Sequence, residues 1–121
     1  MWQHVDMKQR IIQTRQFSKT VDGLLRKRQL LKKDLEEFQR QLAEDPEIGD
    51  RIVGAGGVRK ARLKSATRGK SGGFRVCYYA LTQENELYLL LIYPKNVQEN
   101  LTMEEKSALK ELVRALRGDL K

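Results

Sequence analysis

The sequence predicts an α+β fold: a small antiparallel β-sheet of three or four strands, with two helices before the sheet and one helix after it. Two observations support this prediction. Apolar residues recur at three- or four-residue intervals before residue 45 and again after residue 102, as on amphipathic helices. Between residues 58 and 93 the pattern changes to alternation and short apolar runs, as in strands. Because 121 residues suffice for one core, we interpret residues 8–121 as a single domain and residues 1–7 as an N-terminal leader or extension.

The first half of the chain is predicted to be mostly helical. Ile11 and Ile12, in the run 8–14, indicate a short strand, and a first helix is expected over about 19–27. A second helix is expected over 29–43, because four apolar side chains follow one another at helical spacing along one face. These side chains are Leu31, Leu35, Phe38 and Leu42.

A turn separates these helices from the sheet. Residues 45–49 form the turn, since the residue before a proline disfavours helical backbone, and the glycine-rich segment 54–57 marks the start of the sheet. Loops at 71–73 and 83–85 then connect the strands into an antiparallel meander. The run 87–93 is apolar at every position, so we expect a central strand covered on both faces. Three strands are expected, at 58–64, 74–81 and 87–93.

The last helix is predicted from its first turn. Residues 102–105 are Thr-Met-Glu-Glu, which is the spacing of a capping box at a helix N-terminus. An apolar stripe at helical spacing follows and ends near Gly118, so we expect a third helix here. The stripe consists of Ala108, Leu109, Leu112, Val113 and Leu116.

Several classes of protein are excluded by composition. The longest apolar run, 87–94, is far shorter than a membrane span. The lone Cys77 has no partner for an internal disulfide and the N-terminus lacks the apolar segment of a secretory signal, which indicates the cytoplasm. The single histidine, His4, lies in the predicted leader, so we expect no metal and no cofactor.

The charge of the chain is concentrated in one segment. Of the formal net charge of +8, all is carried by residues 51–83, which contain no Asp or Glu. A local positive field of this size indicates an anionic partner, with RNA or DNA first among the candidates. The cations of the segment are Arg51, Arg59, Lys60, Arg62, Lys64, Arg68, Lys70 and Arg75.

Strand alternation selects three of these cations as candidates for chemistry. Lys60 and Arg62 lie two residues apart and therefore on one face of the predicted strand, and Arg75 begins the next strand. Guanidinium groups bind phosphate oxygens in a bidentate fork, so the three side chains are suited to stabilising charge in phosphoryl transfer. The alternative is that they are solvated residues of an exposed sheet face.

Five segments together resemble the RelE superfamily of bacterial toxins from type II toxin-antitoxin modules. The closest resemblance is to the RelE-like HigB-type toxins, and it extends over residues 9–116. The segments are Gly49-Asp50 with Ile52, Gly56-Gly57-Val58-Arg59-Lys60-Ala61-Arg62, Gly69-Lys70-Ser71-Gly72-Gly73-Phe74-Arg75, Tyr78-Tyr79, and Leu87-Tyr88-Leu89-Leu90 with Ile92-Tyr93-Pro94-Lys95-Asn96.

The resemblance implies a RelE/ParE-like fold and an mRNA interferase. Such toxins are endoribonucleases that cleave mRNA in the ribosomal A site, without metal, by attack of the ribose 2′-hydroxyl on the adjacent phosphate. A cognate antitoxin protein neutralises them. By position, Lys60 resembles the proton acceptor, Arg62 a phosphate ligand, and Arg75 the arginine that contacts the scissile phosphate. The remaining cations, expected to contact RNA or the ribosome, are Arg59, Lys64, Arg68, Lys70 and Lys95.

Two positions depart from the RelE pattern. Asn96 stands where RelE has its next arginine, and no tyrosine follows Tyr93 to match the C-terminal stacking tyrosine. Tyr79 or Tyr93 would have to replace that stacking contact. Two other functions therefore remain open: a ParE-like toxin that inhibits DNA gyrase through protein contacts, and a plain RNA-binding module.

Overall fold

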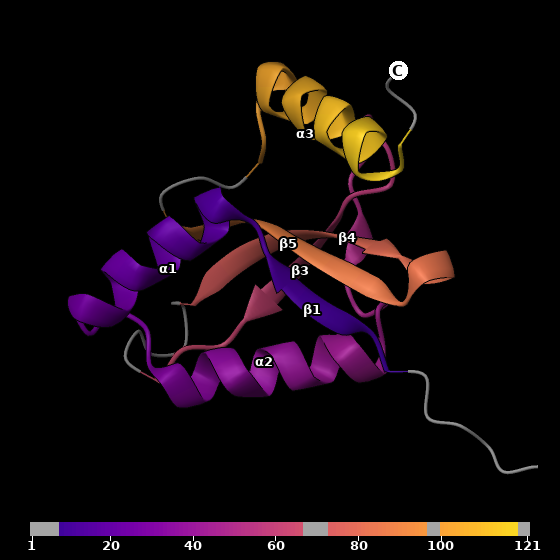
Figure 1. Cartoon of the computed structure of the whole chain (residues 1–121). Helices are drawn as coiled ribbons and strands as arrows, with labels where there is room; N and C mark the ends of the chain where they lie inside the picture. Colours follow the sequence, from indigo (N-terminus) through magenta and orange to yellow (C-terminus); the bar gives the residue numbers. More distant parts are fainter. Residues whose placement is uncertain (1–7, 67–72, 97–99, 119–121) are drawn as a thin grey trace, which may run out of the picture.

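The computed structural model describes residues 8–66, 73–96 and 100–118, and the predicted leader 1–7 lies outside them. A mixed five-stranded sheet has α1 and α2 on one face and α3 on the other (Figure 1). No helix within these ranges has the length and apolar character needed to cross a membrane. The elements are β1 (Arg10–Gln13), α1 (Arg15–Arg26), α2 (Lys32–Glu44), β2 (Asp50–Arg51), β3 (Arg59–Leu63), β4 (Phe74–Leu81), the 3-10 turn η1 (Thr82–Glu84), β5 (Glu86–Pro94) and α3 (Met103–Leu116).

The sheet differs from the prediction in strand number and direction. Its order is β1-β5-β4-β3-β2, so it has five strands rather than three or four. The antiparallel meander of β3, β4 and β5 is confirmed, but β1 pairs with β5 in parallel. β2 has only two residues, too few for an alternating pattern in the sequence. The parallel pairing joins Arg10 to Glu86, and no local pattern indicates a contact across so much chain.

The three predicted helices are confirmed, and the starts of α1 and α2 are shifted. α1 begins at Arg15 rather than near residue 19, because Thr14 caps it: the Thr14 hydroxyl accepts from the Phe17 N–H at 3.4 Å and donates to the Leu89 carbonyl at 3.0 Å. This second bond ties the start of α1 to β5. At α3 the predicted capping box forms, since Thr102 and Glu105 exchange side-chain to backbone hydrogen bonds of 3.1 and 2.8 Å.

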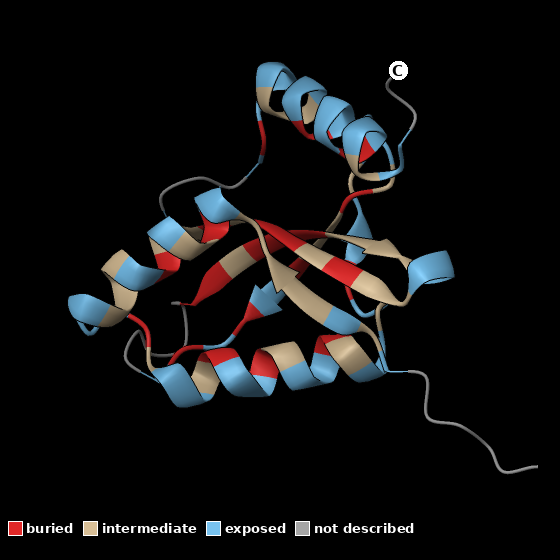
Figure 2. Cartoon of the chain, viewed as in Figure 1, coloured by how far each residue is buried: buried red, intermediate tan, exposed pale blue. Residues whose placement is uncertain are grey.

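Each face of the sheet has its own apolar cluster, and buried residues line the inner sides of the helices (Figure 2). We call the two faces the α1–α2 face and the α3 face. The α1–α2 face is the larger and includes Phe17, Val21, Leu35, Phe38, Leu42, Ala61, Leu63, Phe74, Val76, Tyr78, Leu87, Leu89 and Ile92. The α3 face includes Ala55, Val58, Cys77, Leu90, Leu101, Leu109 and Val113.

A β-bulge determines which face the end of β5 presents. Cys77 pairs with Leu91 while Tyr78 pairs with Leu89, so Leu90 is an extra residue in β5. Beyond an extra residue the alternation of side chains changes phase. Leu89 therefore lies on the α1–α2 face, and Tyr93, an even number of residues later, packs on the α3 face. The bulge brings Tyr93 to the face that carries the cations of β3.

Candidate active site

The cations of β3 and β4 meet on the α3 face. Alternation along β3 buries Ala61 in the opposite, apolar cluster and leaves Lys60 and Arg62 on the α3 side. Arg75 is the direct cross-strand partner of Arg62. The predicted convergence of Lys60, Arg62 and Arg75 is thus a consequence of strand register.

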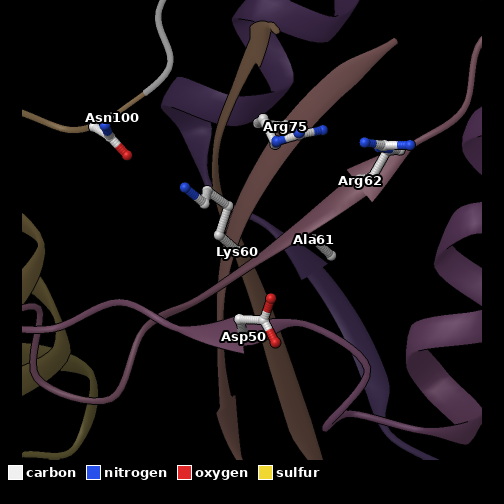
Figure 3. A pocket seen from close by; sticks show the side chains of 6 residues that line it. All are labelled: Asp50, Lys60, Ala61, Arg62, Arg75 and Asn100. Atoms are coloured by element: carbon white, nitrogen blue, oxygen red, sulfur yellow. The ribbon is translucent and has the colours of Figure 1, made fainter.

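These side chains line an open hollow of about 320 Å³ (Figure 3). Lys60 and Arg75 are half-buried, whereas Arg62 is exposed. No ion pair among the described residues includes any of the three. The Arg75 Nη1 atom is buried and has no hydrogen-bond partner. Since a buried donor is normally satisfied, this nitrogen is available to an anionic ligand. The lining residues are Asp50, Lys60, Ala61, Arg62, Arg75 and Asn100.

The pairing of Arg62 with Arg75 is unfavourable for the sheet itself. Like charges directly opposite each other across two strands are destabilising, by roughly 0.2–1 kcal/mol. In the described part of the chain, no carboxylate lies within ion-pair distance of either guanidinium. An anion bound between them would remove the repulsion. The arrangement therefore favours a phosphate ligand over a purely structural role.

Neutral side chains form the floor beneath the cations. Cys77 is the cross-strand partner of Lys60, and burial raises the pKa of its thiol to about 11, although the Lys60 charge lowers it in part. Tyr93 is the partner of Arg75, and burial, followed by the neighbouring Cys77, raises the pKa of its hydroxyl to about 12. The Tyr93 hydroxyl is buried beside the Cys77 thiol. Both groups are uncharged near neutral pH, so Cys77 is not an activated nucleophile.

The edge of the hollow is positioned from the other face of the sheet. The buried Tyr78 hydroxyl accepts a hydrogen bond from the Gly49 N–H at 2.9 Å and donates to the Pro46 carbonyl at 2.8 Å. A Cβ on Gly49 would lie 2.7 Å from the Lys60 carbonyl oxygen, so only glycine allows this approach of β2 to β3. These contacts place Asp50 directly opposite Lys60.

Two lining residues, Asp50 and Asn100, are missed by the sequence prediction. Asp50 borders the carboxylate-free segment and directly follows Gly49, but a two-residue strand gives no alternation from which its direction can be inferred. Asn100 lies between β5 and α3, where no periodic pattern exists. Asp50 and Lys60 are strand neighbours and yet form no ion pair.

The remaining predicted contacts are distributed around the molecule. Arg59 donates to the Gly49 carbonyl at 2.6 Å and, with Tyr79, lines a separate hollow. Lys64 lines a third hollow beside α2, which also includes Arg62. Lys95 is half-buried just past β5 and does not line the hollow of Lys60. Two further predicted contacts, Arg68 and Lys70, lie outside the described residues.

In the described part of the chain, no three His, Cys, Asp or Glu side chains gather where they could hold a metal ion. The family model described as "RelE toxin of RelE / RelB toxin-antitoxin system" matches residues 9–119. This match includes all five strands, all three helices and every residue that lines the cationic hollow. The chain belongs to the RelE toxin family of toxin-antitoxin modules.

Proposed function

We propose that this toxin is a ribosome-dependent endoribonuclease that cuts mRNA in the ribosomal A site. The observation that supports it is the convergence of Lys60, Arg62 and Arg75 in one open hollow, with a buried, unpartnered Arg75 nitrogen. An inhibitor that acts through protein contacts does not require three cations in one hollow. The ParE-like alternative is therefore less well supported.

The reaction that fits these side chains is an internal transesterification. The ribose 2′-oxygen forms a bond to the adjacent phosphorus while the bond from phosphorus to the 5′-oxygen breaks, giving a 2′,3′-cyclic phosphate and a 5′-hydroxyl. Lys60, in its neutral amine form, accepts the proton of the 2′-hydroxyl. The leaving 5′-oxygen takes a proton from water, and the hydroxide so formed removes the proton from Lys60 and restores the amine. Arg62 and Arg75 stabilise the additional negative charge on the phosphoryl oxygens. No metal is needed for this step.

Ribosome and antitoxin are the partners that we propose. The dependence on the ribosome and the likeness to HigB-type toxins rest on the sequence motifs. The proposed cytoplasmic location rests on the lone, unpaired Cys77. A cationic hollow is electrostatically complementary to an acidic segment, so an acidic antitoxin segment would associate rapidly and block it.

Expression of variants with mapping of transcript ends tests the proposal. Lys60→Ala, Arg62→Ala and Arg75→Ala should each lower the cleavage rate by about 10²–10⁴-fold and relieve growth arrest. Arg114→Ala is the matched control, because Arg114 is an exposed cation on α3 that pairs with Glu111. Cuts within translated codons support the nuclease. An intact transcriptome with broken DNA would support gyrase inhibition, and full toxicity of all three variants would refute the catalytic assignment.

A further inference from the structure

The N-terminal half of the chain has nearly balanced charges that are separated in space. Residues 1–50 contain ten Lys or Arg and nine Asp or Glu, which cancel in a count. No acidic residue occurs between Asp22 and Asp34, however, and five exposed cations lie there, where α1 ends and α2 begins. We call them the hairpin tip: Arg26, Lys27, Arg28, Lys32 and Lys33.

The tip cations have no carboxylate partners. No ion pair of the described residues includes one of the five. At the opposite end of α2, by contrast, Arg40 pairs with Glu37 at 2.6 Å and with Glu44 at 2.9 Å. An ordinary solvated surface mixes charges of both signs, as this opposite end does. Residues 23–33 carry positive charges only, and Asp22 and Asp34 border this segment.

Local stability does not explain the two tip lysines. Lys32 and Lys33 lie in the first turn of α2, where the helix dipole disfavours positive charge. No side chain caps this end, because the N-cap residue is Leu31. Asp34, in the same turn, complements the dipole, whereas the two lysines work against it. A charge pattern that opposes the local preference is typical of a functional surface.

The tip is continuous with the cationic hollow. The Ala66 N–H, just after β3, donates to the Asp34 carboxylate at 3.0 Å, which holds the end of β3 against the start of α2 (Figure 1). Arg62 lines both the cationic hollow and the neighbouring hollow of about 310 Å³, which Lys64 and the α2 side chains of Asp34, Glu37 and Phe38 also line. Arg75, Arg62 and Lys64 therefore form a row of cations toward the tip, and the two carboxylates of this second hollow lie on its α2 side.

We propose that the hairpin tip is a second RNA-binding site, which holds backbone phosphates outside the point of cleavage. A phosphodiester chain seated at Arg75 has repeating charges that can follow such a track, and phosphate contacts position a nucleic acid without reading its sequence. This site is additional to the proposed function. It depends on that proposal in one respect, namely that the polyanion is RNA. It adds affinity and orientation, and it takes no part in bond cleavage.

The test measures binding of a fluorescent 2′-O-methyl oligoribonucleotide, which has no 2′-hydroxyl to attack, over a range of salt concentrations. The tip triple Arg28→Gln, Lys32→Gln, Lys33→Gln is compared with the control triple Arg10→Gln, Arg40→Gln, Arg114→Gln. Each triple removes three exposed cations, but those of the control are paired with carboxylates. With a slope of about −0.7 per phosphate contact, loss of three contacts should lower the magnitude of the salt slope by about 2 and weaken binding by about 100-fold at 0.1 M salt.

Two outcomes would overturn this site. If both triples lose affinity equally, only net charge matters and the tip makes no local contact. If the tip triple binds RNA as the control does but loses affinity for a polyglutamate peptide, the surface serves an acidic protein instead. Failure of the nuclease proposal can be distinguished from failure of the tip site. A wild-type chain that binds RNA through the tip without cutting translated mRNA would refute the nuclease and keep the site.

Discussion

The two faces of the sheet are built from the same strands and have different tasks. The α1–α2 face is apolar along its whole cluster and closed by two helices. The α3 face is apolar only beneath α3, and its remaining part is the open hollow of Lys60, Arg62 and Arg75. Because side chains alternate along a strand, one residue can stabilise the fold while the next is free for chemistry. Residues that stabilise the fold and residues of the proposed active site thus alternate along the same strands.

The largest effect on stability is expected on the α1–α2 face. Leu89 is fully buried, so Leu89→Ala should lower the free energy of unfolding by about 2–5 kcal/mol through lost contacts and a cavity. Urea denaturation measures the change. Val53→Ala is the control, because Val53 is 85% exposed and should change stability by less than about 0.5 kcal/mol. Equal effects in the two variants would contradict the division between the faces.

Tyr78→Phe examines a residue that links the two faces. Its ring packs on the α1–α2 face, while its hydroxyl holds the turn before Asp50. Loss of this hydroxyl leaves the Gly49 N–H unsatisfied and should lower stability by about 1–3 kcal/mol. Weaker cleavage should accompany it, since β2 loosens at the edge of the hollow. In the control Tyr88→Phe only a side-chain bond to Glu86 is lost, so cleavage should not change. Unaltered cleavage in Tyr78→Phe would show that β2 is held independently of this hydroxyl.

Alkaline pH should destabilise the protein through two buried groups on the α3 face. The pKa values of Cys77 and Tyr93 are raised from 9.0 to about 11 and from 10.0 to about 12, so both groups favour the folded state while they are neutral. Their contribution is complete below about pH 9 and is lost as the pH rises toward 12, because the unfolded chain ionises first. Urea midpoints between pH 8 and pH 11 measure this loss. In Cys77→Ala and Tyr93→Phe the decline in stability with pH should be shallower. An identical decline in wild type and both variants would refute the contribution of these two groups.

The smallest effect is an expected gain in stability. Arg62→Gln removes the like-charge pair with Arg75 and should raise the free energy of unfolding by about 0.2–1 kcal/mol while cleavage falls. Thermal and urea unfolding at low salt would detect it, because screening is weakest there. Lys64→Gln is the control, since Lys64 lies beyond the end of β3 and has no cross-strand cation. A less stable Arg62→Gln protein would mean that the two arginines are not a strained pair.

The sequence by itself determined most of the local structure. Helical spacing gave α2 and α3, the Thr102 capping box gave the start of α3, and alternation placed Lys60 and Arg62 on one face of β3. These features depend on neighbours within a few residues, so their signals are complete in the sequence. The family resemblance, now supported by the match over residues 9–119, rests on the same local motifs.

Only the tertiary structure decided which distant residues meet. The parallel pairing of β1 with β5, the placement of Asp50 and Asn100 beside Lys60, and the bulge at Leu90 all depend on register between segments far apart in the chain. The hairpin tip shows the same limit for charge. The positive and negative charges of residues 1–50 nearly cancel in number, but folding carries the cations of 26–33 to one end of α2, while Glu44, Asp45 and Glu47 lie at its other end. Strand register and the spatial separation of charge depend on how two distant segments come together. Local sequence patterns report on neighbours within a few residues, so they do not specify either property.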